Sequence, residues 1–323
     1  MTPNDYDRIG RRKRLNPVST GKRVTLQPRD WAWLELLHAH GPLASSFLLQ
    51  STSAMHASEK RAKERLTDLF NENNTPHGGS YLTRPPQQFL TLDSRYNQLV
   101  YELAPAAERA LKEAGLWRET NLTGGGPWLH QFMVSSITAS IRLAADVRDD
   151  LGFIPQADIL ERAGAGLSWP VTFVDSVSKR TVTKDLKSDA LFGLEYKTRE
   201  GSRFRFFAVE ADRATEPLTS KTFNRKSALR NLLQYRAYIA EGAYKKHLKL
   251  TAPLLVLNVY SDPTRTEHAL KLVGEQSPGG NPYMLFQSWE DFAPPFRPPE
   301  FNESLLHSNW MRSGKNKMSI LNV

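Results

Sequence analysis

Three carboxylates in the second half of the chain have the types and the spacing of a metal site. Asp189 stands at the start of one extended segment, and Glu210 and Asp212 stand two residues apart at the end of the next. Residues two apart in a strand share a face, so Glu210 and Asp212 are expected to point the same way. If the turn at 198–202 joins the segments as an antiparallel pair, Asp189 comes to lie beside Glu210. The pattern predicts that Asp189, Glu210 and Asp212 bind Mg²⁺ or Mn²⁺, which prefer oxygen ligands.

Such an ion supplies what phosphodiester cleavage needs, because it polarises a phosphoryl oxygen and lowers the pKa of a bound water. The next predicted helix presents a stripe of residues four apart, which are Lys226, Arg230, Gln234 and Tyr238. We expect Lys226 or Gln234 to touch phosphate and Arg230 to contact DNA. The predicted catalytic set is Asp189, Glu210, Asp212, Lys226, Gln234 and Tyr238. The alternative stays open that Asp189 is a turn residue and that Glu210 and Asp212 are a solvated strand end with Arg213 and Glu216 beside them.

The elements that must position these residues predict an α/β domain in the order α-β-β-β-α-β. A long helix is expected at 128–150, and short apolar or alternating runs predict strands. The expected strands are 169–175, 188–197, 203–211, 253–260 and 283–287, and the further helices are 224–241 and 264–273. Three glycines within 121–127 predict a linker, because no Gly-Lys-Ser/Thr follows to form a phosphate-binding loop.

The first half of the chain predicts a smaller domain in which helices precede a β-hairpin. Pro28 suits the first turn of a helix and Gly41-Pro42 suits its end. Further helices are expected at 43–50, 56–72 and 105–115, and extended segments at 79–83, 88–92 and 98–103. This order is that of a winged helix.

The basic helix at 56–72 has the position of a recognition helix, which enters the major groove of DNA in such domains. The candidate DNA contacts are Ser58, Lys60, Arg61, Lys63 and Arg65. Two alternatives stay open. In the first, these residues lie on a solvent-exposed face and contact no DNA. In the second, the domain binds another protein, as some winged helices do.

The charge of the chain agrees with a polyanionic partner. The 323 residues carry a net charge of +9 and no cysteine. Residues 8–23 hold seven Lys or Arg and no acid, and residues 221–249 hold eight against Glu241 alone. We expect double-stranded DNA as the partner. Without cysteine, disulfides, thiol nucleophiles and Cys zinc sites are excluded, and any metal must be held by oxygen or histidine.

The order of these residues resembles the PD-(D/E)XK nuclease superfamily, and its Gln-x-x-x-Tyr motif is similar to the RecB-like branch. The whole chain, over about 28–290, is similar to the replication-relaxation family of bacterial plasmids and mobile elements. The matching segments are Tyr101-Glu-Leu-Ala-Pro-Ala-Ala-Glu-Arg-Ala-Leu111, His130, Ser188-Asp-Ala-Leu191 and Phe206-Phe-Ala-Val-Glu-Ala-Asp-Arg-Ala-Thr-Glu216. The resemblance implies a winged helix, a nuclease-like domain and a role in replication, DNA relaxation or mobilisation.

Two departures bear on catalysis. The superfamily has Pro before its Asp, where this chain has Ser188, and Lys two residues after its Glu, where this chain has Asp212. That Lys positions or activates the water, so Lys226 is the candidate replacement. The enzyme hypothesis is a Mg²⁺-dependent nicking endonuclease, and its counterpart is a degenerate, DNA-binding version.

The predicted fold is therefore α/β (α+β), with a winged helix-turn-helix domain followed by a restriction-endonuclease-like α-β-β-β-α-β domain. The expected boundaries are a basic flexible arm at 1–27, the winged helix at 28–120, a linker at 121–127, the nuclease-like domain at 128–290 and a loose Pro-rich, basic tail at 291–323. No signal peptide and no membrane-spanning run is expected, and we expect a cytoplasmic location. A transcriptional regulator, a scaffold that recruits a relaxase or replication protein, and a homodimer remain open.

Overall fold

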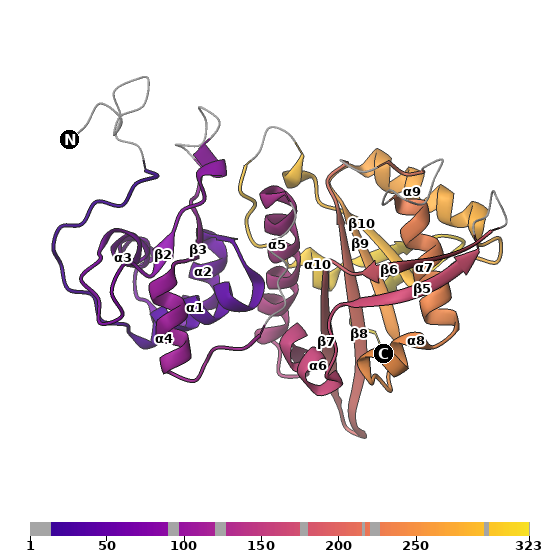
Figure 1. Cartoon of the computed structure of the whole chain (residues 1–323), viewed down its shortest axis with the longest axis horizontal. Helices are drawn as coiled ribbons and strands as arrows, with labels where there is room; N and C mark the ends of the chain where they lie inside the picture. Colours follow the sequence, from indigo (N-terminus) through magenta and orange to yellow (C-terminus); the bar gives the residue numbers. More distant parts are fainter. Residues whose placement is uncertain are drawn as a thin grey trace. The chain divides into compact units, whose positions relative to one another are not determined.

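The computed structural model describes residues 14–89, 97–119, 127–174, 180–214, 217–219, 227–293 and 297–322. The chain divides into two compact units (Figure 1). The first unit is Met1–Glu119 with Phe296–Phe301, and the second is Thr120–Pro295 with Asn302–Val323. Both are built from helices and strands, so the fold is mixed α/β.

The first unit places helices against a small antiparallel sheet. Its elements are α1 (Pro28–His40), β1 (Leu43–Ala44), α2 (Ser45–Ser51), the 3₁₀ turn η2 (Ser53–Met55), α3 (Glu59–Asn71), β2 (Leu82–Thr83), the 3₁₀ turn η3 (Pro86–Phe89), β3 (Val100–Leu103) and α4 (Pro105–Glu113). Among its described residues the strand order is β1-β3-β2. Extended structure was expected at 88–92, but 86–89 form η3 and 90–92 lie outside the described residues.

Local sequence explains the helices of this unit. Pro28 occupies the first turn of α1, and the Asp30 carboxylate accepts from the backbone N–H of Gln27 at 2.9 Å. Gly41 ends α1 with a φ of 96°, a conformation that favours glycine. The fully buried Trp33 donates from its indole N–H to the Leu48 carbonyl at 2.6 Å, which ties α1 to α2.

Helix α3 has two different faces. Ala62, Leu66, Leu69 and Phe70 are buried against the unit, at spacings of three and four. These spacings put one apolar stripe on a helix and leave Glu59, Lys60, Arg61, Lys63 and Glu64 exposed. The helix therefore presents its charged face to solvent.

The second unit is a larger sheet covered on both faces. It begins with α5 (Trp128–Asp146), β4 (Leu151–Ile154), α6 (Gln156–Ala163), β5 (Ser168–Val174), β6 (Thr181–Lys187), β7 (Ala190–Thr198) and β8 (Gly201–Asp212). It continues with α7 (Ala228–Ala240), α8 (Ala243–Leu248), β9 (Leu254–Tyr260), α9 (Pro263–Gln276), β10 (Met284–Ser288), the 3₁₀ turn η5 (Glu290–Phe292), α10 (Ser304–His307), β11 (Asn309–Arg312) and β12 (Lys315–Ser319).

The described strands of this unit form a seven-stranded sheet in the order β12-β11-β10-β9-β8-β7-β4, and β5 and β6 pair separately. Strands β8, β9 and β10 run parallel, and β7 pairs antiparallel with β8. Helix α5 packs on one face, and α7 and α9 pack on the other (Figure 1). Alternate residues of β8 serve the two faces, so Phe207 stacks on Phe192 at 5.0 Å while Phe206 joins the core beneath α7.

The segment expected to be a loose tail is folded where it is described. Residues 304–319 form α10, β11 and β12 and extend the sheet beyond β10. Trp310 and Ile320 are fully buried. Two large apolar side chains favour docking over a free tail, despite the prolines before them. In the part of the chain that the structure describes, no helix is both long enough and apolar enough to cross a membrane.

Candidate functional site

The antiparallel pair β7–β8 brings Asp189 to the end of β8. Ala190 pairs with Val209, and the backbone N–H of Asp189 donates to the Val209 carbonyl at 3.1 Å. The Asp189 carboxylate accepts in turn from the backbone N–H of Ala211 at 2.9 Å. Its other oxygen lies 3.2 Å from Nε2 of His130, in the first turn of α5. The hairpin therefore gathers Asp189 with the last residues of β8.

Glu210 is buried under α7. Its Oε1 accepts from the Tyr235 hydroxyl at 2.6 Å, and its Oε2 accepts from the Asn231 amide at 3.1 Å. Tyr235 and Asn231 are four apart on α7, so they present both donors side by side. Burial, with the nearby charges of Glu210 and Asp189, raises the pKa of Tyr235 well above its usual value. The phenol therefore stays protonated and serves as the donor.

Asp212 is held by Arg265. The guanidinium donates from Nε to Oδ1 at 3.0 Å and from Nη2 to Oδ2 at 2.7 Å, which is a bidentate pair. The backbone N–H of Ala214 donates to the same carboxylate at 2.6 Å. We did not predict a role for Arg265. The position of Arg265 near Asp212 could be inferred, because α9 starts just after β9, and the end of β9 pairs with Asp212 through Tyr260.

Two residues of the predicted stripe, Gln234 and Arg230, form hydrogen bonds with the backbone of β6. Gln234 is buried and donates to the Lys184 carbonyl of β6 at 3.0 Å, while its side-chain oxygen accepts from Arg230 at 3.1 Å. Arg230 also donates to the Asp185 carbonyl at 3.3 Å. Both side chains therefore hold β6, and the phosphate contact of Gln234 and the DNA contact of Arg230 stay predictions.

Tyr238 makes its hydrogen bond to a histidine and not to the carboxylates. Its hydroxyl lies 2.7 Å from Nδ1 of the buried His247, whose Nε2 lies 2.8 Å from the Gly166 carbonyl. A carbonyl can only accept, so Nε2 carries a proton. Burial lowers the pKa of His247, and in the neutral ring Nδ1 then accepts from the Tyr238 hydroxyl. Tyr238 is thus part of a buried hydrogen-bond chain, and its catalytic role stays a prediction. Lys226, the other member of the stripe, lies outside the described residues.

The three carboxylates as arranged do not fit a divalent ion. Each accepts hydrogen bonds from protein donors: Asp189 from Ala211, Glu210 from Tyr235 and Asn231, and Asp212 from Arg265. Within the described ranges, no group of three or more His, Asp or Glu side chains could hold a metal ion. The sheet edge is an ion-paired and hydrogen-bonded cluster, and the predicted three-carboxylate metal site stays a prediction.

The predicted DNA contacts on α3 fall into two groups. Lys60, Arg61 and Lys63 are exposed, and Lys63 pairs with Glu59 one turn away. Ser58 is the residue before the first turn, and its side chain makes no capping bond. Arg65 is different, because its guanidinium makes a bidentate pair with the fully buried Asp30 at 2.6–3.2 Å. That side chain ties α3 to α1, and its predicted DNA contact stays a prediction.

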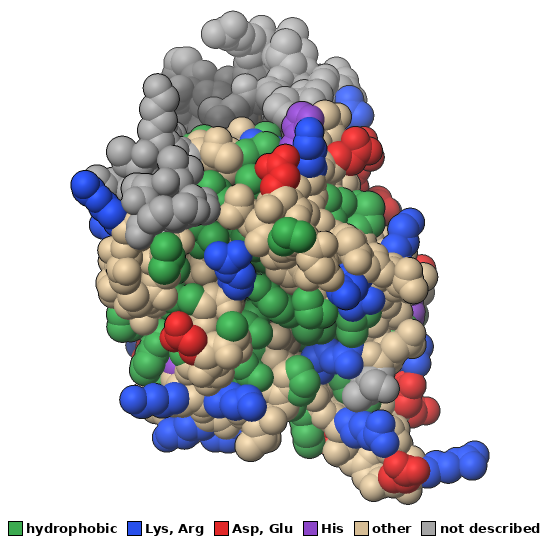
Figure 2. Space-filling view, turned by 90° about the vertical axis from the view of Figure 1, so that its right-hand side faces the viewer, with side chains coloured by type: hydrophobic (Ala, Val, Ile, Leu, Met, Phe, Trp, Pro, Cys, Tyr) green, Lys and Arg blue, Asp and Glu red, His purple; other side chains and the backbone are tan. Residues whose placement is uncertain are grey.

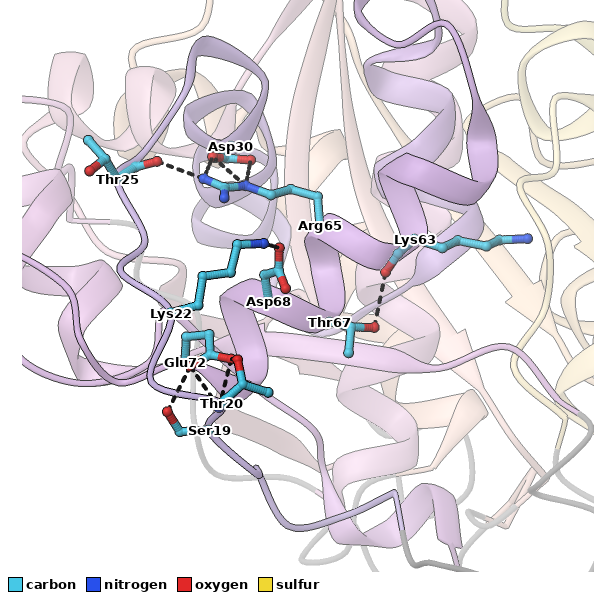
Figure 3. A network of polar contacts seen from close by, with 10 residues as sticks. All are labelled: Ser19, Thr20, Lys22, Thr25, Asp30, Lys63, Arg65, Thr67, Asp68 and Glu72. Atoms are coloured by element: carbon cyan, nitrogen blue, oxygen red, sulfur yellow. Dashed lines mark hydrogen bonds and ion pairs between the residues drawn. The ribbon is translucent and has the colours of Figure 1, made fainter.

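A segment without helix or strand lies along the C-terminal half of α3 (Figure 3). We call residues 14–27 the arm segment. Ser19 and Thr20 donate to the Glu72 carboxylate, and Lys22 pairs with Asp68. Burial opposes ionisation of Glu72, but the hydrogen bonds from Ser19, Thr20 and Lys22 outweigh it and lower the pKa to about 2. A loose arm was expected, and the described part of it is anchored.

The second unit also carries exposed cations. Lys245, Lys246 and Lys249 follow one another on and just after α8, and all three are exposed. Figure 2 shows Lys and Arg side chains along the lower margin of one face of the molecule, among isolated acidic side chains. These lysines offer a matched comparison for the cations of α3.

The fold and the polar cluster define a mixed α/β protein of two units, one with an exposed basic helix and one with a carboxylate cluster at a sheet edge. The chain belongs to the replication-relaxation family, whose profile matches residues 34–254. Membership indicates a DNA-related role associated with replication and confirms the resemblance found in the sequence.

Comparisons beyond the family add little. No curated protein matches the chain. Among solved structures, the SdaI restriction endonuclease is similar with 10% identity, covering 76% of this chain and 84% of that chain at a TM-score of 0.17. This TM-score is too low to infer a shared fold.

Proposed function

We propose that this protein binds double-stranded DNA through its first unit, acting at a replication or transfer origin of a mobile element. The first unit would be a winged helix and α3 its recognition helix. The observation that carries the proposal is the exposed cationic first half of α3, with Lys60, Arg61 and Lys63 outside and an apolar stripe inside.

The order of elements supports this role for α3. Helices α1 and α2 precede α3, and β2 and β3 follow it, which is the layout of a winged helix. In that layout the recognition helix lies in the major groove, where Lys and Arg contact phosphates and guanine edges. The family's link to replication agrees with a DNA partner.

We expect the full-length protein to bind a duplex of about 25 base pairs with an affinity that falls steeply with salt. Each phosphate neutralised releases counterions, so log K falls with log[salt] by about 0.9 per contact. Fluorescence anisotropy at several salt concentrations between about 0.05 and 0.2 M measures the slope. Absence of binding at the lowest salt, or binding that ignores salt, would refute the proposal.

For the second unit we propose a nuclease-like domain that does not cleave. Two features support this. Asp212 stands where the superfamily has its Lys, and both of its oxygens accept from Arg265, while Tyr235 and Asn231 each donate to one oxygen of Glu210. The carboxylates then stabilise the sheet edge, and DNA binding by the first unit does not depend on them.

Supercoiled plasmid incubated with the protein is expected to stay supercoiled with Mg²⁺ or Mn²⁺, to the same extent as with EDTA. Agarose gels that separate supercoiled from nicked plasmid give the measurement. Nicking that requires the metal, and that disappears in Asp189→Asn but persists in Asp185→Asn, would establish the enzyme instead. Asp185 is a matched exposed acid on β6.

A regulator or a scaffold remains the second class of function. Both would bind DNA through the same helix, so salt dependence does not separate them. A footprint inside the protein's own promoter favours the regulator, and retention of a relaxase or replication protein on bound DNA favours the scaffold.

A further inference from the structure

The arm segment and α3 are joined at one carboxylate. Glu72 directly follows α3 and is 2% exposed. It accepts from the Ser19 hydroxyl at 2.7 Å, from the Thr20 hydroxyl at 2.7 Å and from the Thr20 backbone N–H at 3.0 Å (Figure 3). Ser19 and Thr20 themselves are exposed. The anchor is therefore buried while the residues that grip it face solvent.

Further contacts hold the same segment along the helix. The backbone N–H of Val18 donates to the Asn71 side chain at 3.1 Å, and that of Val24 donates to the Asn74 carbonyl at 3.1 Å. Val24 is fully buried. The Thr25 carbonyl accepts from Arg65 at 2.6 Å. The arm segment thus runs from the end of α3 back to its middle.

The charges of α3 explain why this contact matters for DNA. Residues 59–72 carry four cations and four acids, so the helix with its following residue is neutral. The cations Lys60, Arg61 and Lys63 lie in its first half, and Asp68 and Glu72 lie toward its end. Acids beside a phosphate backbone repel it. The arm segment covers these two acids, with Lys22 on Asp68 and the hydroxyls on Glu72.

We propose that the arm segment is part of the DNA-binding surface, and that its attachment at Glu72 is required for α3 to bind duplex DNA. The inference rests on the proposed function of the first unit. Attached, the segment pairs Lys22 with Asp68, contacts the buried Glu72 and adds Arg23 to the basic side, with no acid of its own in 14–27. Detached, it leaves the end of α3 negative.

The attachment can be broken at one exposed residue, Thr20. The Thr20 hydroxyl and backbone N–H both point at the Glu72 carboxylate. An aspartate at this position brings two carboxylates together in a half-covered contact, where like charges repel strongly. Asn16→Asp adds the same charge to an exposed residue of the same segment, four positions away, and serves as the control.

The test uses the full-length protein and three variants: Thr20→Asp, Asn16→Asp, and Thr20→Asp combined with Glu72→Gln. Trypsin cleavage after Lys22 and Arg23, followed by mass spectrometry, reports attachment, and anisotropy with a duplex reports DNA affinity. We expect Thr20→Asp to speed cleavage and to weaken DNA binding about tenfold at low salt. Asn16→Asp should stay within about twofold, and the double variant should recover most of the loss because the repulsion is gone.

Each outcome decides the inference. A Thr20→Asp variant that stays protected from trypsin overturns Glu72 as the anchor. Faster cleavage with unchanged DNA affinity overturns the role of attachment, while the proposed function stands. An equal loss in Asn16→Asp, without rescue in the double variant, also overturns it. If the wild-type protein does not bind duplex DNA, the proposed function fails first and the inference falls with it.

Discussion

Replacing Lys60, Arg61 and Lys63 together by alanine is expected to weaken duplex binding about 100- to 1000-fold. A cationic side chain in contact with a base edge contributes at least about 1 kcal/mol, so the loss of three contributes about 3–4 kcal/mol, which is about 100- to 1000-fold in affinity. The salt slope should also become shallower by about three units, because about one counterion is released for each contact. Anisotropy titrations over a range of salt measure both quantities.

The three residues are exposed, so the unfolding midpoint should change little. The matched control removes the same number of charges from α8 and the residue that follows it, in Lys245→Ala/Lys246→Ala/Lys249→Ala. We expect that control to lose less than about threefold. If both triple variants lose the same amount of DNA affinity, DNA is attracted by net charge alone and α3 is not the DNA-binding helix.

The Arg65→Met variant is expected to lower the free energy of unfolding by about 3–5 kcal/mol. Breaking a buried ion pair leaves the other charge buried and uncompensated. Asp30 is fully buried and would keep the single bond from the Gln27 backbone N–H among those described here. Urea denaturation followed by circular dichroism gives the measurement.

A second variant separates the charge from the packing. Asp30→Asn combined with Arg65→Met removes the stranded charge and keeps an oxygen for the Gln27 N–H, so we expect it to recover more than half of the loss. DNA affinity of the folded Arg65→Met protein should fall far less than in the α3 triple variant. A variant that stays stable but loses DNA binding would return Arg65 to the DNA contacts.

The part of the site that the sequence predicts correctly is the part whose geometry depends only on residue spacing along the chain. The period of two along β8 and the length of the hairpin were enough to bring Asp189 beside Glu210, because both are local rules. The apolar stripe of α3 likewise predicts which of its residues face solvent. Lys60, Arg61 and Lys63 are outside for that reason.

Residue spacing does not predict which side chains of other elements a residue will contact. Arg65 lies on the same helix as the three exposed cations. Its side chain is mostly buried because it pairs with Asp30 on α1. Gln234 and Tyr238 follow the motif of a nuclease helix, yet β6 and His247 take their hydrogen bonds. The strand β6 and the helix α8 that supply these partners have weak patterns, since β6 alternates polar residues and α8 is short.

The separate β5–β6 ribbon has a consequence for motion in the second unit. A two-stranded ribbon is marginally stable alone, and this one shares no ladder with the seven-stranded sheet in the described part of the chain. Its ties include the bonds from Gln234 and Arg230 and the buried Val171, Phe173 and Leu186. Local opening of the ribbon should therefore cost less than global unfolding. The amides of β6 would exchange with deuterium before those of β8, so the soft element of this unit packs on α7, the helix that also holds Glu210.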